Sequence, residues 1–407
     1  MGCFRIDLSS SLELIFYVLS LLQAYRAVQL AGRIRKDWSG FQQSPLTRQK
    51  MHLVEQSAFF LAIPPSVLVH ELFHAIPIWL YGGRIASCGY GFYWGFVQAD
   101  RLFPSTQDWL ISLGGTLGSL LFAAVLFTFL NWNKSQTLRY FGRQSLRTLL
   151  NYSLIYYPIF TAVTFIGDWR IIYDFGATPV LSGATAVVHA GLLLLFWQAN
   201  RRGWFEIVGH QTEKEAATFA QLQADLQRNP HDARLVLLVA EALADGGATG
   251  KATRLLQQAI RHNPNEAPLY VKLAVIQHGG KGRVPGTAVR NLEKALQLGL
   301  SDAYQRAAAH YLLAQFQLDK GQGQSALDHL AQAFSAAEGQ TVTFNPLFKA
   351  KLYQLRSLAY QRLRQPDLAY EAAQQAVAVA QETGNEQAVA YYQGKLKLIE
   401  DWNGRRS

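Results

Sequence analysis

Long apolar stretches fill the first half of this 407-residue chain. A helix of about 20 apolar residues can cross a lipid bilayer, and inside the bilayer it must satisfy its own backbone hydrogen bonds. We therefore predict a membrane-embedded, multi-pass helical bundle of about five helices over residues 1–202, in contact with the lipid bilayer. The apolar runs cover residues 12–22, 53–80, 109–132, 149–166 and 180–197.

The second half, residues 203–407, is polar and rich in Ala, Gln and Leu. Small residues recur there at fixed offsets around an apolar or small one, and these offsets resemble those of the tetratricopeptide repeat (TPR). Stacked helix pairs of that kind bury a shared core and expose a concave face that binds proteins or peptides. We predict an α-solenoid of TPR-like helix pairs, with a generic helical bundle as the alternative. The recurring residues are Ala252, Leu256 and Ala259; Ala288, Leu292 and Ala295; Ala326, Leu330 and Ala333; and Ala369, Ala373 and Ala376.

The net charge of +10 comes mainly from the apolar half. Residues 1–202 carry 16 Lys and Arg against 9 Asp and Glu, whereas residues 203–407 carry 22 against 19. The basic residues cluster in the expected linkers at 33–52 and 131–147 and just after residue 200, which indicates membrane topology rather than binding of nucleic acid. Because loops on the cytoplasmic side carry more Lys and Arg, we expect an integral membrane protein whose repeat domain is cytoplasmic.

One apolar run contains the pentad His70-Glu71-Leu72-Phe73-His74. Residues four apart lie on one face of a helix, so both imidazoles can face one metal ion with Glu71 beside it. A pair of structural helix histidines is the alternative. Ionisable side chains at bilayer depth cost about 3 kcal/mol each and are kept mainly where they function or pair. Three of them within five positions indicate a bound cation.

A zinc ion held by two histidines needs a third protein ligand, often a carboxylate, and an open position for water. Asp168 ends the run at 149–166, and the count of crossings brings it to the same depth as the pentad. Asp174 is the second choice, and Asp168 as a simple helix cap is the alternative. We expect His189, in the last run, to have a structural role.

Three local features surround these residues. Pro64-Pro65 should kink or restart the helix just before the pentad. Glycines that alternate with aromatic residues between 82 and 104 favour a short β-hairpin or a re-entrant loop, with an aromatic belt at the membrane interface as the alternative. The small residues at 112–119 favour a helix that packs closely against another in the bundle interior.

The order of these parts resembles the core of the site-2 protease family of intramembrane zinc metalloproteases, over roughly residues 53–175. The shared parts are H-E-x-x-H in a membrane helix, a Gly-aromatic loop, a helix that opens with Gly-Gly-x-x-Gly, and an Asp from a later helix. In the family the Asp is usually followed by Gly, whereas here Gly167 precedes Asp168. The resemblance implies one Zn²⁺ ion held by His70, His74 and Asp168, and Glu71 as the general base.

The activity implied is metal-assisted hydrolysis of peptide bonds in membrane-spanning protein substrates. The loop near residues 84–97 would offer an edge to an unfolded substrate strand, and the repeats would recruit substrates or partners. The alternative function is a catalytically inactive, membrane-anchored TPR scaffold that keeps the fold. A purely structural zinc site would need a fourth Cys or His near the pentad, and none stands out in the sequence.

Overall fold

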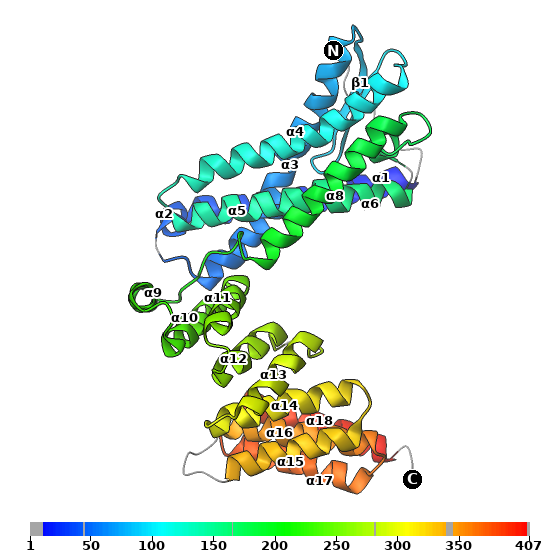
Figure 1. Ribbon diagram of the computed structural model, residues 1–407. Helices are drawn as coiled ribbons and strands as arrows, with labels where there is room; N and C mark the ends of the chain where they lie inside the picture. The colour runs from blue at the N-terminus through cyan, green and yellow to red at the C-terminus, as the bar shows by residue number, and fades with distance from the viewer. Residues whose placement is uncertain (1–10, 44, 165, 281, 339–344, 405–407) are drawn as a thin grey trace. The chain divides into compact units, whose positions relative to one another are not determined.

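The computed structural model describes residues 11–43, 45–164, 166–280, 282–338 and 345–404. The chain is mostly helical and forms two compact units (Figure 1). The first unit comprises Met1–Gln221 with Asp245–Lys251, and the second comprises Leu222–Ala244 with Ala252–Ser407.

The first unit contains long helices, one two-stranded sheet and a short π-helix, labelled η1. Helices α3, α4 and α5 pack against one another (Figure 1). The elements are α1 (Ser11–Lys36), α2 (Trp38–Gln42), α3 (Arg48–Leu80), β1 (Ile85–Tyr90), β2 (Gly95–Ala99), α4 (Ser105–Asn131), α5 (Gln136–Asn151), η1 (Tyr152–Tyr156), α6 (Tyr157–Thr164), α7 (Trp169–Ile172) and α8 (Pro179–Arg201), followed by α9 (Glu213–Arg228), which continues into the second unit.

Within the described ranges, three helices are long and apolar enough to cross a membrane, namely α3, α4 and α8. The sequence predicted about five spans. The run at 12–22 is the start of the longer helix α1, and the run at 149–166 is divided among α5, η1 and α6. The predicted basic linkers are partly wrong, because their charged residues lie on helices. Arg33, Arg35 and Lys36 belong to α1, and Arg139, Arg143 and Arg147 belong to α5.

A kink or a restart was predicted at Pro64-Pro65. The restart is wrong, because α3 continues through both prolines, and the kink stays a prediction. Pro64 has no N–H to donate to the carbonyl of Phe60, one turn earlier. The Tyr93 hydroxyl donates to that carbonyl instead, with an oxygen–oxygen distance of 2.8 Å. The Tyr90 hydroxyl donates to the carbonyl of Pro64 at 2.9 Å. The Tyr93 hydroxyl, a donor from outside the helix, therefore replaces the backbone bond that Pro64 cannot make.

Both tyrosines belong to the segment in which the sequence left a hairpin and a re-entrant loop open, and the structure has a hairpin. Strands β1 and β2 are antiparallel, with Cys88 opposite Val97 and Tyr90 opposite Gly95. The hairpin packs on α3. The predicted close packing at 112–119 is also observed. Ser112 and Ser119 are buried on α4, which packs against α3.

The second unit is a succession of helices in which neighbours along the chain pack together, as α12 with α13, α14 with α15, and α16 with α17. The predicted repeat residues fall on alternate helices, and all of them are buried, with at most 6% of their surface exposed. The recurring small residues thus mark a shared core. The helices are α10 (Ala233–Asp245), α11 (Thr249–His262), α12 (Ala267–His278), α13 (Gly286–Leu298), α14 (Ala303–Asp319), α15 (Gly323–Glu338), α16 (Pro346–Arg362), α17 (Pro366–Gln381) and α18 (Glu386–Gly404).

Candidate metal centre

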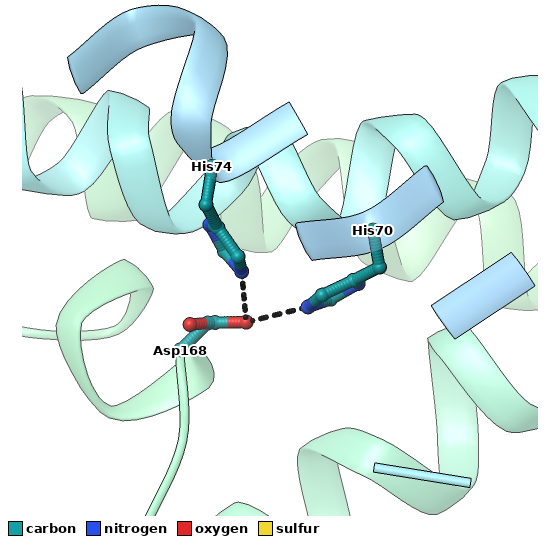
Figure 2. Close-up of side chains that lie close together, drawn as sticks. All are labelled: His70, His74 and Asp168. Atoms are coloured by element: carbon teal, nitrogen blue, oxygen red, sulfur yellow. Dashed lines mark hydrogen bonds and ion pairs between the residues drawn. The ribbon is translucent and has the colours of Figure 1, made fainter. Parts of the chain in front are cut away.

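Two histidines of α3 and one aspartate from a distant part of the chain lie close together. The Nε2 atom of His70 lies 3.0 Å from Oδ2 of Asp168, and Nε2 of His74 lies 3.2 Å from the same oxygen. Figure 2 shows both rings, one helical turn apart on α3, directed at this carboxylate. All three ligand atoms lie within 4.8 Å of one another, and the described residues contain no other such group of three or more His, Cys, Asp or Glu.

Helix α4 orients both imidazoles. Nδ1 of His74 lies 2.7 Å from the carbonyl oxygen of Ile111, and Nδ1 of His70 lies 3.2 Å from Oγ of Ser119. A carbonyl can only accept, so Nδ1 of His74 carries a proton, and Nε2 of the neutral ring presents a lone pair. That lone pair faces a carboxylate oxygen, which is also an acceptor. The contact therefore requires a cation between the two atoms, either a metal ion or a proton.

The glycines of α4 make room for the two rings. A Cβ atom on Gly115 would lie 2.4 Å from Nε2 of His74 and 2.6 Å from Nε2 of His70. The neighbouring Gly114 and Gly118 lie equally close to Phe73, whose carbonyl oxygen and ring would be 2.5 Å and 2.6 Å from the added carbons. This Gly-Gly-x-x-Gly face is therefore the surface against which the pentad packs.

Asp168 is held by Tyr157, a residue that the sequence analysis did not single out. The Tyr157 hydroxyl donates to Oδ2 of Asp168 at 2.9 Å and accepts from the Asp168 backbone N–H at 3.3 Å. Gly167 has a φ of +118°, and a Cβ atom there would lie 2.9 Å from the same hydroxyl. The order Gly167-Asp168 thus has a local cause, because a side chain at 167 would be strained and would displace Tyr157.

Glu71 lies beside the hairpin. A Cβ atom on Gly95, the first residue of β2, would be 2.8 Å from Oε1 of Glu71. The absence of a side chain at 95 lets the strand backbone approach the carboxylate closely. Glu71 is half-buried and stands outside the group of three ligand atoms.

Two other sequence candidates lie elsewhere. Asp174 accepts hydrogen bonds from the backbone N–H groups of Gly176 and Ala177 through Oδ1, and so stabilises a turn. His189 contacts the Leu154 carbonyl through Nε2, at 2.7 Å, and the Tyr173 hydroxyl through Nδ1. The structural role expected for His189 agrees with these contacts.

The donor set fits a zinc ion. Zinc binds histidine nitrogen and carboxylate oxygen at about 2.0–2.2 Å, and a tetrahedral ion then holds its ligand atoms about 3.3 Å apart. The separations of 3.0 Å and 3.2 Å around Oδ2 are close to this value. Two imidazoles and one carboxylate are also the protein ligands of many catalytic zinc sites.

Comparison with known proteins adds little to this picture. No family model and no curated protein matches the chain. Two solved structures, described as crystal structures of MamA protein and of MamA, match at 18% sequence identity with TM-scores of 0.32 and 0.33. Each match covers 42% of this chain, and the matches cover 85% and 91% of the MamA chains. Superpositions at this level carry no argument about function.

Proposed function

We propose that the chain is an intramembrane zinc metalloendopeptidase that hydrolyses peptide bonds of membrane-spanning proteins. The observation that carries the proposal is the convergence of His70, His74 and Asp168, with Glu71 next in sequence to the first ligand. The alternative is a catalytically inactive scaffold with the same fold.

The residues divide into two roles. His70, His74 and Asp168 would hold the ion, which when bound supplies Lewis-acid chemistry and lowers the pKa of water. Glu71, one residue along the helix from His70, would act as the general base that removes a proton from the attacking water. A bilayer site needs a polar cavity to admit that water, and the approach of Gly95 to Glu71 marks where the peptide backbone of the hairpin reaches the site.

The hairpin suggests how a substrate would be presented. Within the described part of the chain its two strands pair only with each other, so each strand has one edge without a partner strand. An extended peptide can add to such an edge through backbone hydrogen bonds. Because Gly95 begins β2 beside Glu71, a substrate strand added along β2 would run past the proposed base.

The helical repeats would serve recruitment. We propose that the second unit is a TPR-like array and that its concave face binds a protein or peptide partner. The charge distribution favours a cytoplasmic location for it. We propose α3, α4 and α8 as membrane spans together with the apolar run at 149–166, so that the basic segments before α3 and after α4 lie on the same side as the repeats. Protease added to sealed vesicles should digest the repeats if the cytoplasmic face of the membrane is on the outside. It should leave them intact if that face is on the inside.

The decisive experiment compares the wild-type chain with Glu71→Gln in proteoliposomes. Zinc content is measured by mass spectrometry, and cleavage is measured on single-span model peptides that carry helix-breaking residues in the span. We expect one zinc ion per chain in both proteins. Cleavage should be lost in the variant, because an amide cannot accept the proton from water as a carboxylate does.

Glu55→Gln is the matched control, since Glu55 is on the same helix and its partner, the Tyr140 hydroxyl, can donate equally to an amide oxygen. This control should cleave like the wild type. Turnover that persists in Glu71→Gln would overturn the assigned base. If the wild type binds zinc but cleaves no peptide, the inactive scaffold is favoured. If the wild type binds no zinc, the proposed zinc site is wrong.

A further inference from the structure

The hydroxyl of Tyr157 makes two hydrogen bonds to a single residue. It donates its proton to Oδ2 of Asp168 and accepts from the Asp168 backbone N–H, at 2.9 Å and 3.3 Å. Oδ2 is also the oxygen that faces both imidazoles. The Tyr157 hydroxyl therefore holds both the carboxylate and the backbone of Asp168. It contacts the carboxylate at Oδ2, the oxygen that would bind a metal ion.

A π-turn directs Tyr157 toward Asp168. The Tyr157 N–H donates to the carbonyl of Tyr152, five residues earlier, instead of four as in an α-helix. One extra residue in a turn shifts all later side chains by about 100° around the helix axis. The π-helix thus places Tyr157 on a face that a regular helix would give to a neighbouring residue. Such single π-turns occur often at functional sites.

Pro158 and His189 maintain this turn. Pro158 has no N–H for the carbonyl of Leu154, and Nε2 of His189 lies 2.7 Å from that oxygen instead. The other nitrogen of the ring contacts the Tyr173 hydroxyl, and the ring centroid lies 4.6 Å from that of Trp169. One side chain therefore connects the turn before Tyr157 with the residues just after Asp168.

From this arrangement we infer that Tyr157 is a positioning residue that sets the zinc affinity of the site by fixing the orientation of the Asp168 carboxylate. The inference rests on the zinc site of the proposed function. Without the hydroxyl, the carboxylate can rotate away from the imidazoles and its backbone N–H loses a partner. Loss of a residue that orients a metal ligand typically weakens metal binding by about 10–100-fold.

Tyr157→Phe removes only the hydroxyl. Zinc affinity of the purified full-length chain in detergent is measured by competition with a chromogenic chelator. We expect binding about 10–100-fold weaker than that of the wild type. Tyr156→Phe is the matched control, because Tyr156 is the adjacent residue, is 55% exposed and stacks on Tyr152 and Phe160. Its zinc affinity should equal that of the wild type.

A double-mutant cycle separates positioning from general packing. Adding Tyr157→Phe to Asp168→Asn should cause little further loss of affinity, because the hydroxyl acts through Asp168. An equal loss in both backgrounds would overturn the inference, as would unchanged affinity in the single variant. If Tyr157→Phe does not fold, Gly167→Ala replaces it, since the new methyl displaces the same hydroxyl and should weaken zinc binding similarly.

The measurement does not depend on peptidase activity. A chain that binds zinc with the expected Tyr157 dependence but cleaves no peptide would keep this inference and remove the proposed function. If the chain cleaves peptides but Tyr157→Phe binds zinc as tightly as the wild type, the proposed function is kept and this inference is overturned. A wild-type chain that binds no zinc would remove both.

Discussion

Asp168 Oδ2 lies 3.0 Å from Nε2 of His70, a residue 98 positions earlier in the chain. Three helices and the segment that carries Asp168 must be placed together for these atoms to meet. The ring belongs to α3 and is oriented by α4, and the carboxylate is held by Tyr157 at the start of α6. The predictions below address the parts of the fold that establish this contact and the repeats that follow it.

Asp168→Asn should bind zinc measurably but more weakly, and so lose it on gel filtration, whereas Asp174→Asn should retain it. An amide oxygen carries no charge and is a poorer ligand than a carboxylate, and Asp174 instead caps a turn. Zinc content after gel filtration at a fixed zinc concentration measures the difference. Equal zinc loss in the two variants would contradict the ligand assignment.

Gly115→Ala should empty the metal site without unfolding α4. The methyl would lie 2.4 Å from Nε2 of His74, so the ring has to move, although alanine favours a helix by about 1 kcal/mol over glycine. The control is Gly183→Ala on α8, where no atom lies within 4 Å of the added carbon. Zinc stoichiometry should fall well below one only in Gly115→Ala, with helicity by circular dichroism unchanged in both.

Tyr93→Phe should destabilise the first unit by about 1–3 kcal/mol, because the Phe60 carbonyl freed by Pro64 loses its donor. The thermal midpoint of the detergent-solubilised chain measures this effect. Tyr25→Phe, on an exposed tyrosine of α1, serves as the control and should melt like the wild type. If the two variants had the same midpoint, the side-chain bond would not be what replaces the backbone bond.

The repeat unit should lose stability as the pH falls below about 6.5. Burial, with a smaller contribution from His329, lowers the pKa of His310 to about 4. The unfolded chain, whose histidines have a pKa of about 6.5, therefore takes up a proton before the folded one does, and stability is lost between these two values. The Nδ1 atoms of the two rings are 3.2 Å apart, so a proton on His310 would face a neighbouring ring nitrogen.

Hydrogen exchange of α14 and α15 in the full-length chain, corrected for intrinsic rates, measures this loss at pH 7 and pH 5. His310→Gln should show a smaller drop in protection than the wild type. His231→Gln, at an exposed histidine of the same unit, should behave like the wild type. Equal pH dependence in all three proteins would show that the His310–His329 pair does not control the effect.

The sequence predicts contacts where they follow from the spacing of residues along the chain. The pentad put His70 and His74 on one helix face, and the depth argument selected Asp168 from among the acids of the chain. The offsets around Leu256, Leu292 and Leu330 located buried residues on alternate helices, because small residues mark where helices approach closely.

The contacts that it could not predict depend on partners far away in the sequence. A kink or a restart was expected at Pro64 because the helix loses a hydrogen bond there. The helix does not restart, and a hydroxyl from the hairpin compensates for the lost bond. Arg139 and Arg143 were predicted to lie in a linker, but they belong to α5. A search for apolar runs finds only helices that are apolar on all sides, and α5 is amphipathic. Tyr157 was missed because a π-turn decides where it points. Pro158 within an apolar run was the one available signal.

The two tyrosine bonds from the hairpin to α3 also govern how the hairpin can move. Lifting the hairpin would leave the Phe60 oxygen without its donor, which costs about 1–3 kcal/mol. The hairpin is therefore tied to the helix that carries the pentad, and moving it away requires another donor for the Phe60 carbonyl.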